Sequence, residues 1–396
     1  FVVVELGDHH VTVLDGGRFR PITRFASRFA LHGGPKFSPE GRFVYFCSRD
    51  GWVTKYDLWN LRTVAEVRAG INARNLAVSD DGRFVMVANY LPQTLVLLSA
   101  DELAPLKLYP VADAAGHGSR VSAVYTAAPR GSFVAALKDV QEVWEIPYRD
   151  DLPVHAGPTQ DDRAGAAGRS AALEPRRIAL DDVLDDFFFD PAYRHLIGAS
   201  RDGGKGQVID LDAGTRIATL DLPGMPHLGS GITWEWQGRP VLATPNLKES
   251  AITVIDMTNW QVIKRIPTLG PSFFMRSHAQ LDTAWIDVSL GRVAESGRAP
   301  EFAARDLCAV SGFPASKVAE VQDAFEIYQP VVHEPLDGAP GGSRQSSVRM
   351  RMQLGPSHAG AHGLAQFQLL DLGFRKLALI AGVDAVTAVE RFDIQI

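Results

Sequence analysis

SPEGRFVYF at residues 38–46 and SDDGRFVMV at residues 79–87 decide the fold of this 396-residue chain. When the first stretch is laid over the second, Gly41 falls on Gly82, which lies 41 residues later. A repeat of about 40–45 residues is typical of the four-stranded blades of a propeller. The chain is therefore expected to be built from blades.

A second repeated element is a strand, a turn that begins at an Asp, and another strand. It occurs as TKYDLWNLRTVAEV (54–67), QVIDLDAGTRIATL (207–220) and TVIDMTNWQVIKRI (253–266). An Asp side chain can accept a hydrogen bond from the backbone two residues on, which closes the turn. The Val, Ile, Tyr and Trp residues on either side suit pleated, half-buried strands. Each element is predicted to be a β-hairpin.

Further β-runs occur at residues 1–15, 120–147, 193–224 and 272–288, which makes six blade-like units and the start of a seventh before residue 290. Radial repetition spares a long β protein a free sheet edge, and it leaves a central channel with a rim of loops. We therefore expect an all-β propeller over residues 1–289. Residues 155–175, rich in Gly, Ala and Asp, are expected to be a surface excursion between blades.

The blade pattern stops at about residue 290. Residues 298–329 resemble short helical runs, and residues 334–366 show neither a strand period nor a helix period. Two explanations stay open for residues 290–396: a genuine appended segment, or an out-of-frame translation of blade-coding DNA. The second is favoured, because an open propeller would leave unpaired strand edges. Resequencing the DNA across codon 290 tests it.

Composition excludes several classes of protein. Hydrophobic residues make up 46% and charged residues 22%, and no run of 18 or more apolar residues predicts a membrane span. A net charge of −6 argues against a nucleic-acid surface. Cys47 and Cys308 form no C-x-x-C or C-x-x-C-H motif, so no zinc ribbon or covalently attached haem is encoded. The chain starts at Phe1, so a signal peptide could precede it.

Two loop histidines are the first candidate site residues. His32 lies in ALHGGP, and His227 lies in LPGMPHLGSGITW (222–234), a stretch rich in Gly and Pro. Either can be an ordinary loop residue. Neutral imidazole is also a good axial ligand for haem iron, and glycines let a bulky macrocycle approach the backbone.

Charged residues near strand ends are the second set of candidates. The run LDDVLDDFFFDP (180–191) reads as a solvated acidic turn before a core strand, although Asp185 or Asp186 could face the channel. Arg49, Arg74 and Arg276 fall at strand ends of separate blades. A lone Arg there is usually a surface residue, but several on one rim would bind carboxylates, since a guanidinium pairs with them in bidentate fashion. No hydrolase or nucleotide-binding motif occurs.

Several of these segments closely resemble the NirF family of haem d1 biosynthesis proteins, which shares the d1-binding propeller of dissimilatory nitrite reductase. The segments include residues 30–67, 180–203, 222–247 and 270–288, and the resemblance covers residues 1 to about 289. It implies an eight-bladed periplasmic propeller that binds haem d1 or a dihydro or other late precursor. The likeness does not extend to residues 290–396. In the family, the corresponding segment closes the ring of blades.

By position, the resemblance makes His32 the axial iron ligand and His227 one of two distal-pocket histidines. The other distal histidine falls on Asp185, which puts nitrite reduction in doubt, because a carboxylate would repel nitrite. Asp185 and His227 are then expected to move protons during a late modification of the macrocycle, held at its carboxylates by Arg49, Arg74 and Arg276. Other haem d1 biosynthesis proteins and the nitrite reductase are the implied protein partners.

Two other functions stay open at this point: a d1-type nitrite reductase fragment, and a propeller that serves only as a scaffold or carrier. The sequence leaves undecided whether the protein performs chemistry or only stores and passes on the tetrapyrrole.

Overall fold

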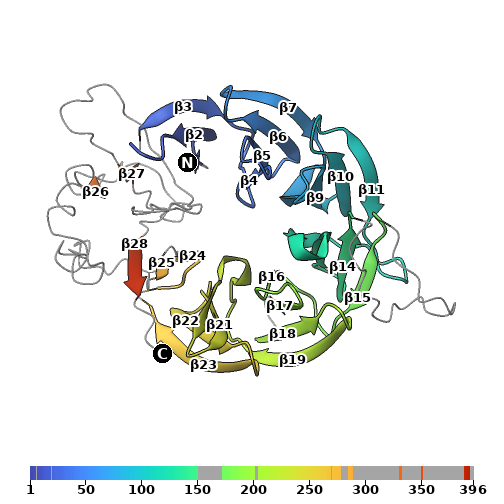
Figure 1. Cartoon of the computed structure of the whole chain (residues 1–396), viewed down its shortest axis with the longest axis vertical. Coiled ribbons are helices and arrows are strands. Elements are labelled where there is room, and N and C mark those ends of the chain that lie inside the picture. Colours follow the sequence, from blue (N-terminus) through green and yellow to red (C-terminus); the bar gives the residue numbers. More distant parts are fainter. Residues whose placement is uncertain are drawn as a thin grey trace, which may run out of the picture.

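The computed structural model describes residues 1–149 except 6 and 19, then 172–200, 204–268, 270–277 and 284–288, together with three short segments at 330–331, 349–350 and 388–392. These residues form strands and two short 3₁₀ turns, η1 (Ala128–Arg130) and η2 (Leu228–Ser230). The sheets follow one another around an open centre, as in a propeller (Figure 1). The all-β expectation is confirmed.

Five sheets have the four antiparallel strands of a complete blade. In order along the chain, their strands are β4 (Lys36–Phe37), β5 (Phe43–Cys47), β6 (Trp52–Asp57) and β7 (Arg62–Arg68); β8 (Asn72–Val78), β9 (Phe84–Leu91), β10 (Thr94–Ser99) and β11 (Pro105–Pro110); β12 (Val121–Ala127), β13 (Ser132–Leu137), β14 (Glu142–Pro147) and β15 (Arg176–Ala179); β16 (Asp186–Phe189), β17 (His195–Ala199), β18 (Lys205–Asp210) and β19 (Thr215–Asp221); β20 (Ile232–Trp236), β21 (Arg239–Thr244), β22 (Ala251–Asp256) and β23 (Gln261–Pro267). In each sheet the first strand lies nearest the centre of the ring and the fourth lies at its circumference (Figure 1).

Three smaller sheets occupy the rest of the ring. One contains β1 (Val2–Glu5), β2 (His10–Leu14) and β3 (Pro21–Ala26), and another contains β24 (Met275–Ser277), β25 (Ala284–Val288) and β28 (Ala388–Phe392). The smallest pairs β26 (Pro330–Val331) with β27 (Arg349–Met350). Residues 290–396 thus contribute three strands, one of which pairs with β25. The helical runs expected at 298–329 and most of the excursion at 155–175 lie outside the described residues.

The repeated Ser-x-x-Gly-Arg-Phe stretch forms the turn between the first and second strands of a blade. In one copy the amide of Phe43 donates to Oγ of Ser38, and in the next the amide of Phe84 donates to Oγ of Ser79. Gly41 and Gly82 have φ values of 73° and 70°, a left-handed conformation that glycine adopts without steric cost. The repeat seen in the sequence is therefore a repeat of turn chemistry, and the prediction of blades from it is confirmed.

The three Asp residues of the second repeat close the turns between third and fourth strands. Asp57 accepts from the amide of Trp59, Asp210 from that of Asp212, and Asp256 from that of Thr258. An Arg at the start of the second strand also pairs with each carboxylate, and these are Arg42, Arg194 and Arg239. The Arg42 guanidinium holds the pKa of Asp57 well below its usual range. The hairpin prediction is confirmed.

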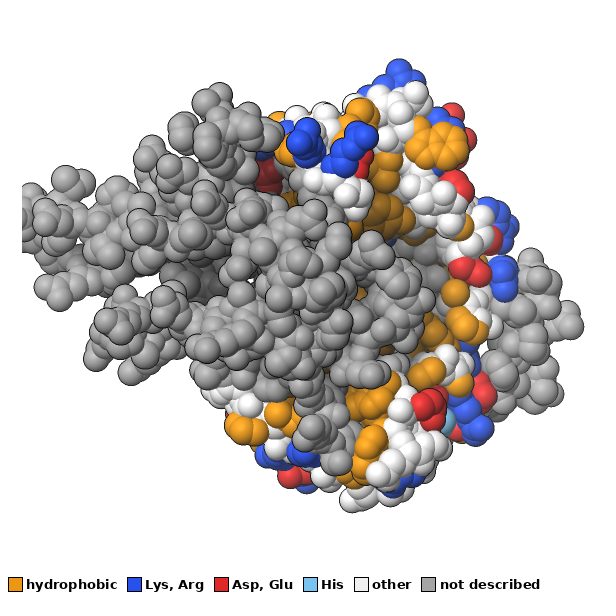
Figure 2. All heavy atoms as spheres, turned by 60° about the vertical axis from the view of Figure 1, so that its left-hand side comes forward, with side chains coloured by type: hydrophobic (Ala, Val, Ile, Leu, Met, Phe, Trp, Pro, Cys, Tyr) orange, Lys and Arg blue, Asp and Glu red, His pale blue; other side chains and the backbone are white. Residues whose placement is uncertain are grey.

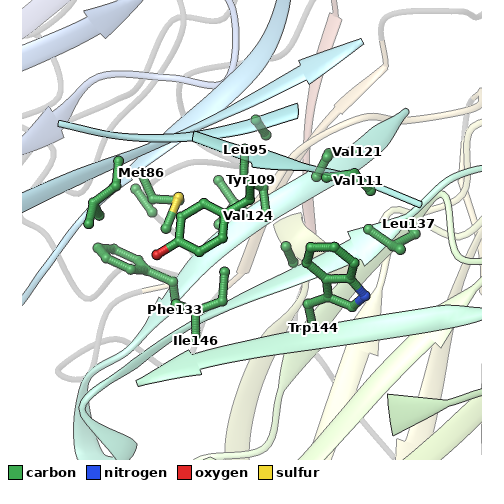
Figure 3. Close-up of a cluster of buried hydrophobic side chains, with 14 of the residues drawn as sticks. Met86, Leu95, Tyr109, Val111, Val121, Val124, Phe133, Leu137, Trp144 and Ile146 are labelled. Carbon is green, nitrogen blue, oxygen red and sulfur yellow. The ribbon is translucent and has the colours of Figure 1, made fainter. Parts of the chain in front are cut away.

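The hydrophobic core lies between neighbouring blades. One cluster joins the sheet β8–β11 to the sheet β12–β15, with Met86 and Leu95 on one side and Phe133, Trp144 and Ile146 on the other (Figure 3). Middle strands are almost completely buried, whereas outermost strands such as β7 alternate between exposed and half-buried residues. Each fully buried aliphatic or aromatic side chain stabilises the fold by about 1.5–3 kcal/mol.

The surface of the described residues mixes both charges. On the face turned forward in Figure 2, Lys and Arg side chains alternate with Asp and Glu around hydrophobic side chains. In the described part of the chain, no helix is long and apolar enough to cross a membrane.

Candidate functional site

The candidate residues gather at one end of the inner strands. In an antiparallel blade the start of the first strand lies beside the end of the second. His32 precedes β4, Arg74 lies in β8, and His227 precedes β20; all three belong to the entry of a first strand. Arg49 follows β5, the second strand of its blade, and so lies at the same end. We call this end of the channel the hub face.

His32 is held by the neighbouring blade through both ring nitrogens. Its Nδ1 lies 2.6 Å from the carbonyl oxygen of Arg74, to which it donates, and its Nε2 accepts from Nη1 of Arg74 at 2.7 Å. Burial, followed by the positive charges of Arg74 and Arg49, lowers the pKa of His32 to about 3. The imidazole is therefore neutral at physiological pH, with its lone pair on Nε2.

Gly33 allows the loop that carries His32 to approach the next blade. Its φ is +84°, and a Cβ built there would lie 2.5 Å from the Cβ of Asn75. Asn75 in turn links two inner strands, because its side chain donates to the carbonyl of Val124 and accepts from the amide of the same residue. Gly33 therefore permits the close contact between two blades that fixes the position of His32.

Two guanidinium groups beside His32 have no carboxylate partner among the residues that the structure describes. Arg74 donates from Nε to the carbonyl of Ser122 at 3.0 Å and from Nη1 to His32. Arg49 is half-buried and makes no side-chain hydrogen bond within the described ranges. Burial and the nearby charge of Arg74 lower the pKa of Arg49, although both groups remain cationic at neutral pH. This side of the hub face therefore carries positive charge that no described carboxylate neutralises.

Asp185 lies on the other side of the hub face and is paired with a cation. Its Oδ1 forms an ion pair with the ammonium group of Lys138, and both side chains are largely buried. Lys138 follows β13 as Arg49 follows β5, so the two cations occupy equivalent places in their blades. Sequence reasoning did not single out Lys138. The signal was a basic residue followed by Asp after a second strand, seen both in Arg49–Asp50 and in Lys138–Asp139.

His227 approaches Asp186 rather than Asp185. Its Nε2 lies 3.9 Å from Oδ2 of Asp186, while its Nδ1 donates to the carbonyl of Phe273 at 2.5 Å. The amide of Gly229 donates to Oδ2 of Asp186 at 2.8 Å. The structure therefore separates the two neighbouring carboxylates: Asp185 pairs with Lys138, and Asp186 lies beside the histidine.

The loop that carries His227 is fixed by a buried amide. Oδ1 of Asn246 accepts from the amides of Met225, Lys248 and Glu249, and its Nδ2 donates to the carbonyl of Pro223. Asn89 plays the same part in another blade, because its Nδ2 donates to the carbonyl of Ala69, just before Arg74's strand. Asn246 follows the second strand of its blade, and Asn89 lies near the end of the second strand of its own. Each fixes the backbone that leads into a first strand.

Arg276, the third expected carboxylate-binding arginine, lies in β24, where its backbone pairs with Trp285. Its side chain lies outside the described residues. The two histidines are electrostatically connected, since the charge of His227 is one of the influences that lower the pKa of His32.

The residues present fit an iron tetrapyrrole. Across the described part of the chain, no group of three His, Cys, Asp or Glu side chains is arranged to hold a bare metal ion. A macrocycle supplies most of its iron ligands itself, so a single neutral imidazole is enough. A metal-bound histidine commonly donates its other ring nitrogen to a carbonyl, as Nδ1 of His32 does. Ligation at Nε2 would require Arg74 to give up one hydrogen bond, which its Nε contact with Ser122 does not prevent.

A ring of β-blades whose hub carries a neutral histidine, and two guanidinium groups with no carboxylate partner among the described residues, defines a propeller that is suited to an anionic, metal-bearing ligand. The comparison with protein families agrees: residues 1–164 and 167–317 match the model of the cytochrome D1 heme domain. The chain belongs to the cytochrome D1 heme domain family.

The chain is similar to the dihydro-heme d1 dehydrogenase of Pseudomonas aeruginosa, with 60% identity over 292 residues, which are 74% of this chain and 55% of that protein. A solved structure described as dihydro-heme d1 dehydrogenase NirN in complex with DHE is 59% identical, with a TM-score of 0.67, and the match covers 74% of this chain and 58% of that one. The nitrite reductase of Stutzerimonas stutzeri is 24% identical over 72% of this chain and 52% of its own.

The resemblance to NirF is corrected by these comparisons. NirF of Pseudomonas aeruginosa is 26% identical over 72% of this chain and 71% of its own length, far below the 60% of the dehydrogenase. The family-level expectation is confirmed, and the dehydrogenase fits better than NirF. The chain spans about half the length of the dehydrogenase and the reductase.

Proposed function

We propose that this chain binds haem d1 or a late precursor in the channel of the propeller and takes part in a late step of haem d1 formation. One observation carries the proposal: a neutral His32 stands beside two guanidinium groups, Arg49 and Arg74, that have no carboxylate partner in the described part of the chain. Haem d1 and its precursors offer both an iron and several carboxylates. Among the described residues, no carboxylate forms an ion pair with either of these cations.

The dihydro form of haem d1 is the first ligand to test. A relative with 60% identity is named as the dehydrogenase of that compound, and a structural relative is described as its complex with DHE. We carry dihydro-haem d1 over to this chain as the proposed ligand, and dehydrogenation as the proposed reaction class.

Within that proposal His32 would bind the iron through Nε2, and Arg49, Arg74 and Arg276 would hold carboxylates. When bound, the iron macrocycle supplies the redox chemistry, while the protein orients it and shapes its electrostatic environment. His227 and the acidic residues beside it would hold or move a proton on the opposite side of the channel. Asp185 is the other candidate for that role, and its carboxylate forms an ion pair with Lys138.

An eight-bladed ring and a periplasmic location complete the proposal. Five complete sheets and three smaller ones are present in the described residues, and each of the three can be one blade of a closed ring. The periplasm follows from the family resemblance.

The test is a spectroscopic titration of the purified chain with haem d1 and with dihydro-haem d1. We expect a shifted visible spectrum, and we expect His32→Ala to remove the shift and weaken binding at least tenfold. His117→Ala is the matched control, because His117 is exposed and pairs only with Asp113. A spectrum that does not change, or that changes equally in both variants, would favour the scaffold function. Nitrite turnover with a chemical reductant would instead favour a reductase fragment.

A further inference from the structure

Two blades place a cation at the same point of the hub face, directly after the second strand, but they treat it differently. Arg49 follows β5 and has no carboxylate partner among the described residues. Lys138 follows β13 and forms an ion pair with Asp185, which directly precedes β16 of the next blade. The side chains of Lys138 and Asp185 are only 14% and 10% exposed. One blade therefore leaves the place beside its cation to a ligand, whereas the other fills it with a carboxylate of the protein.

The backbone on both sides of this ion pair is fixed by hydrogen bonds between strands. The amide of Lys138 donates to the carbonyl of Arg120 at 2.8 Å, and the amide of Asp185 donates to the carbonyl of Ala199 at 3.0 Å. The two side chains thus start from fixed positions. Because both are largely buried in a close-packed interior, other rotamers have little room.

Ser122 joins the ion pair to the cations on the other side of the hub face. Its Oγ donates to the carbonyl of Leu184 at 2.5 Å, and its own carbonyl accepts from Nε of Arg74 at 3.0 Å. Leu184 is fully buried and packs on Gly198, where a Cβ would lie 2.6 Å from Cδ1 of Leu184. The place of Asp185, the residue after Leu184, is therefore fixed relative to Arg74.

A carboxylate of a ligand would gain little from Lys138. It would have to displace Asp185, and a buried charge that loses its partner is strongly destabilising. Asp186 adds a second carboxylate directly after the first. It is 7% exposed, lies 3.5 Å from the hydroxyl of Tyr125, and forms no ion pair with Lys or Arg among the described residues. Uncharged groups of a ligand meet no such penalty at this place.

We propose that Lys138 and Asp185 together determine ligand specificity, because their ion pair keeps the carboxylates of a ligand away from this side of the hub face. An uncharged edge of the macrocycle then lies against the pair, and the carboxylates lie towards Arg49 and Arg74. The pair thereby selects both the ligand and its orientation in the channel. The inference rests on the proposed function, since it concerns a tetrapyrrole, and it gives the pair a role that involves no proton transfer.

The experiment titrates the whole chain with two iron porphyrins that differ in where their carboxylates lie. Iron coproporphyrin I has a carboxylate at every edge of the macrocycle, whereas iron mesoporphyrin IX has them at one edge only. We expect the wild type to bind the mesoporphyrin about tenfold more tightly, because one carboxylate of the coproporphyrin must face the ion pair. Asp185→Asn should reduce this preference at least about fivefold, since Asp185 no longer neutralises the ammonium group of Lys138.

The matched control removes both charges of the pair. When Lys138→Met is combined with Asp185→Asn, no ammonium group is left to receive the carboxylate, so the preference should change less than about half as much as in Asp185→Asn alone. Asp139→Asn, next to Lys138 but paired with Arg120, should bind both porphyrins as the wild type does. A wild type that binds both porphyrins equally overturns the inference. So does a preference that Asp185→Asn leaves unchanged, or an equal change in the single and the double variant.

A measurement without tetrapyrrole separates this inference from the proposed function. Sulfate, compared with chloride at equal ionic strength, should raise the unfolding temperature of Asp185→Asn by about 2–4 °C more than that of the wild type, because the buried ammonium group then binds an anion. An equal rise in both proteins overturns the inference. If neither porphyrin binds the wild type, the proposed function fails and the sulfate measurement decides the inference. If Asp185→Asn does not fold, the preference of the wild type for the mesoporphyrin decides it.

Discussion

The two histidines of the hub face have the same side chain in opposite surroundings. His32 lies among cations, with Arg74 on one ring nitrogen and Arg49 nearby, so its pKa falls to about 3 and the ring stays neutral. His227 lies beside the carboxylate of Asp186 and against two phenylalanine rings. Cations surround the first histidine, whereas a carboxylate and two aromatic rings surround the second.

The difference shows that residue type alone does not assign a role in this channel. A lone pair is what a metal needs, and a proton held near a substrate is what acid–base chemistry needs. The hub face thus has a cationic side, defined by His32, Arg49 and Arg74, and an acidic side, defined by Lys138, Asp185, Asp186 and His227. Under the proposed function, the carboxylates of the ligand would lie on the cationic side.

The largest expected effect comes from removing Arg49, a cation with no carboxylate partner among the described residues. Arg49→Ala should weaken binding of haem d1 by about 30- to 100-fold, since a charge-assisted contact with a carboxylate is lost from a half-buried place. A spectroscopic titration measures the change. Arg62→Ala, on the exposed outer strand β7, is the control and should bind as the wild type does.

A methyl-esterified tetrapyrrole tells whether that loss concerns carboxylates. Its affinity should already be low, and Arg49→Ala should reduce it no further. If the ester and the free acid lose the same factor in Arg49→Ala, the cationic side does not recognise carboxylates and the comparison between the two sides fails.

The next largest effect is on the free energy of unfolding in acid, and it comes from the protonation of His32. The unfolded chain binds a proton at this histidine below about pH 6.5, whereas the folded chain does so only near pH 3. Stability is therefore lost as the pH falls from 6.5 towards 3. His32→Gln should lose about 2 kcal/mol less than the wild type between pH 6.5 and 5, because one group contributes about 1.4 kcal/mol per pH unit.

Urea unfolding at the two pH values measures this difference. Acidic residues titrate in both proteins and so cancel in the comparison. Equal acid sensitivity of wild type and His32→Gln would show that the imidazole is not kept neutral.

The two glycines next to the histidines should respond differently to a methyl group. In Gly33→Ala the new Cβ meets the Cβ of Asn75 at 2.5 Å on a backbone with φ of +84°, so neither side can move cheaply. In Gly229→Ala it meets the hydroxyl of Tyr125, which is the end of a side chain that can shift. We expect Gly33→Ala to cost about 2–3 kcal/mol and Gly229→Ala about 1 kcal/mol. Thermal unfolding ranks them, and the reverse order would contradict the described packing.

Much of the fold was predictable because blade repeats carry their turn chemistry in the sequence. The turns at Ser38 and Gly41 and at Asp57 are closed by hydrogen bonds between residues that are near in sequence. The spacing of these residues is therefore visible in the sequence as a repeat. The β26–β27 sheet and the pairing of β28 with β25 were not predictable in this way. Strands of two residues show no period, and β28 meets a partner about a hundred residues away.

The site was predictable in its residue types and places but not in its pairings. His32, Arg49, Arg74 and His227 were chosen because each stands at a strand end, and the antiparallel order of each blade brings those ends to one face. Which of Asp185 and Asp186 meets His227 depends on the side of β16 that each residue occupies, and the two alternate along a strand. Lys138 and Tyr125 come from β13's end and β12, so only the folded ring reveals them.

The smallest effect concerns Cys47, the last residue of β5, two residues before Arg49. Its side chain is almost completely buried, and burial raises the pKa of the thiol to about 12. A thiolate is the reactive form, so iodoacetamide at pH 8 should leave Cys47 unlabelled in the native chain and label it after unfolding in urea. Mass spectrometry of the peptide that contains Cys47 reads this site separately from Cys308. Labelling in the native chain would mean that the end of β5 opens to solvent. Arg49, two residues further on, would then have no fixed position on the cationic side of the hub face.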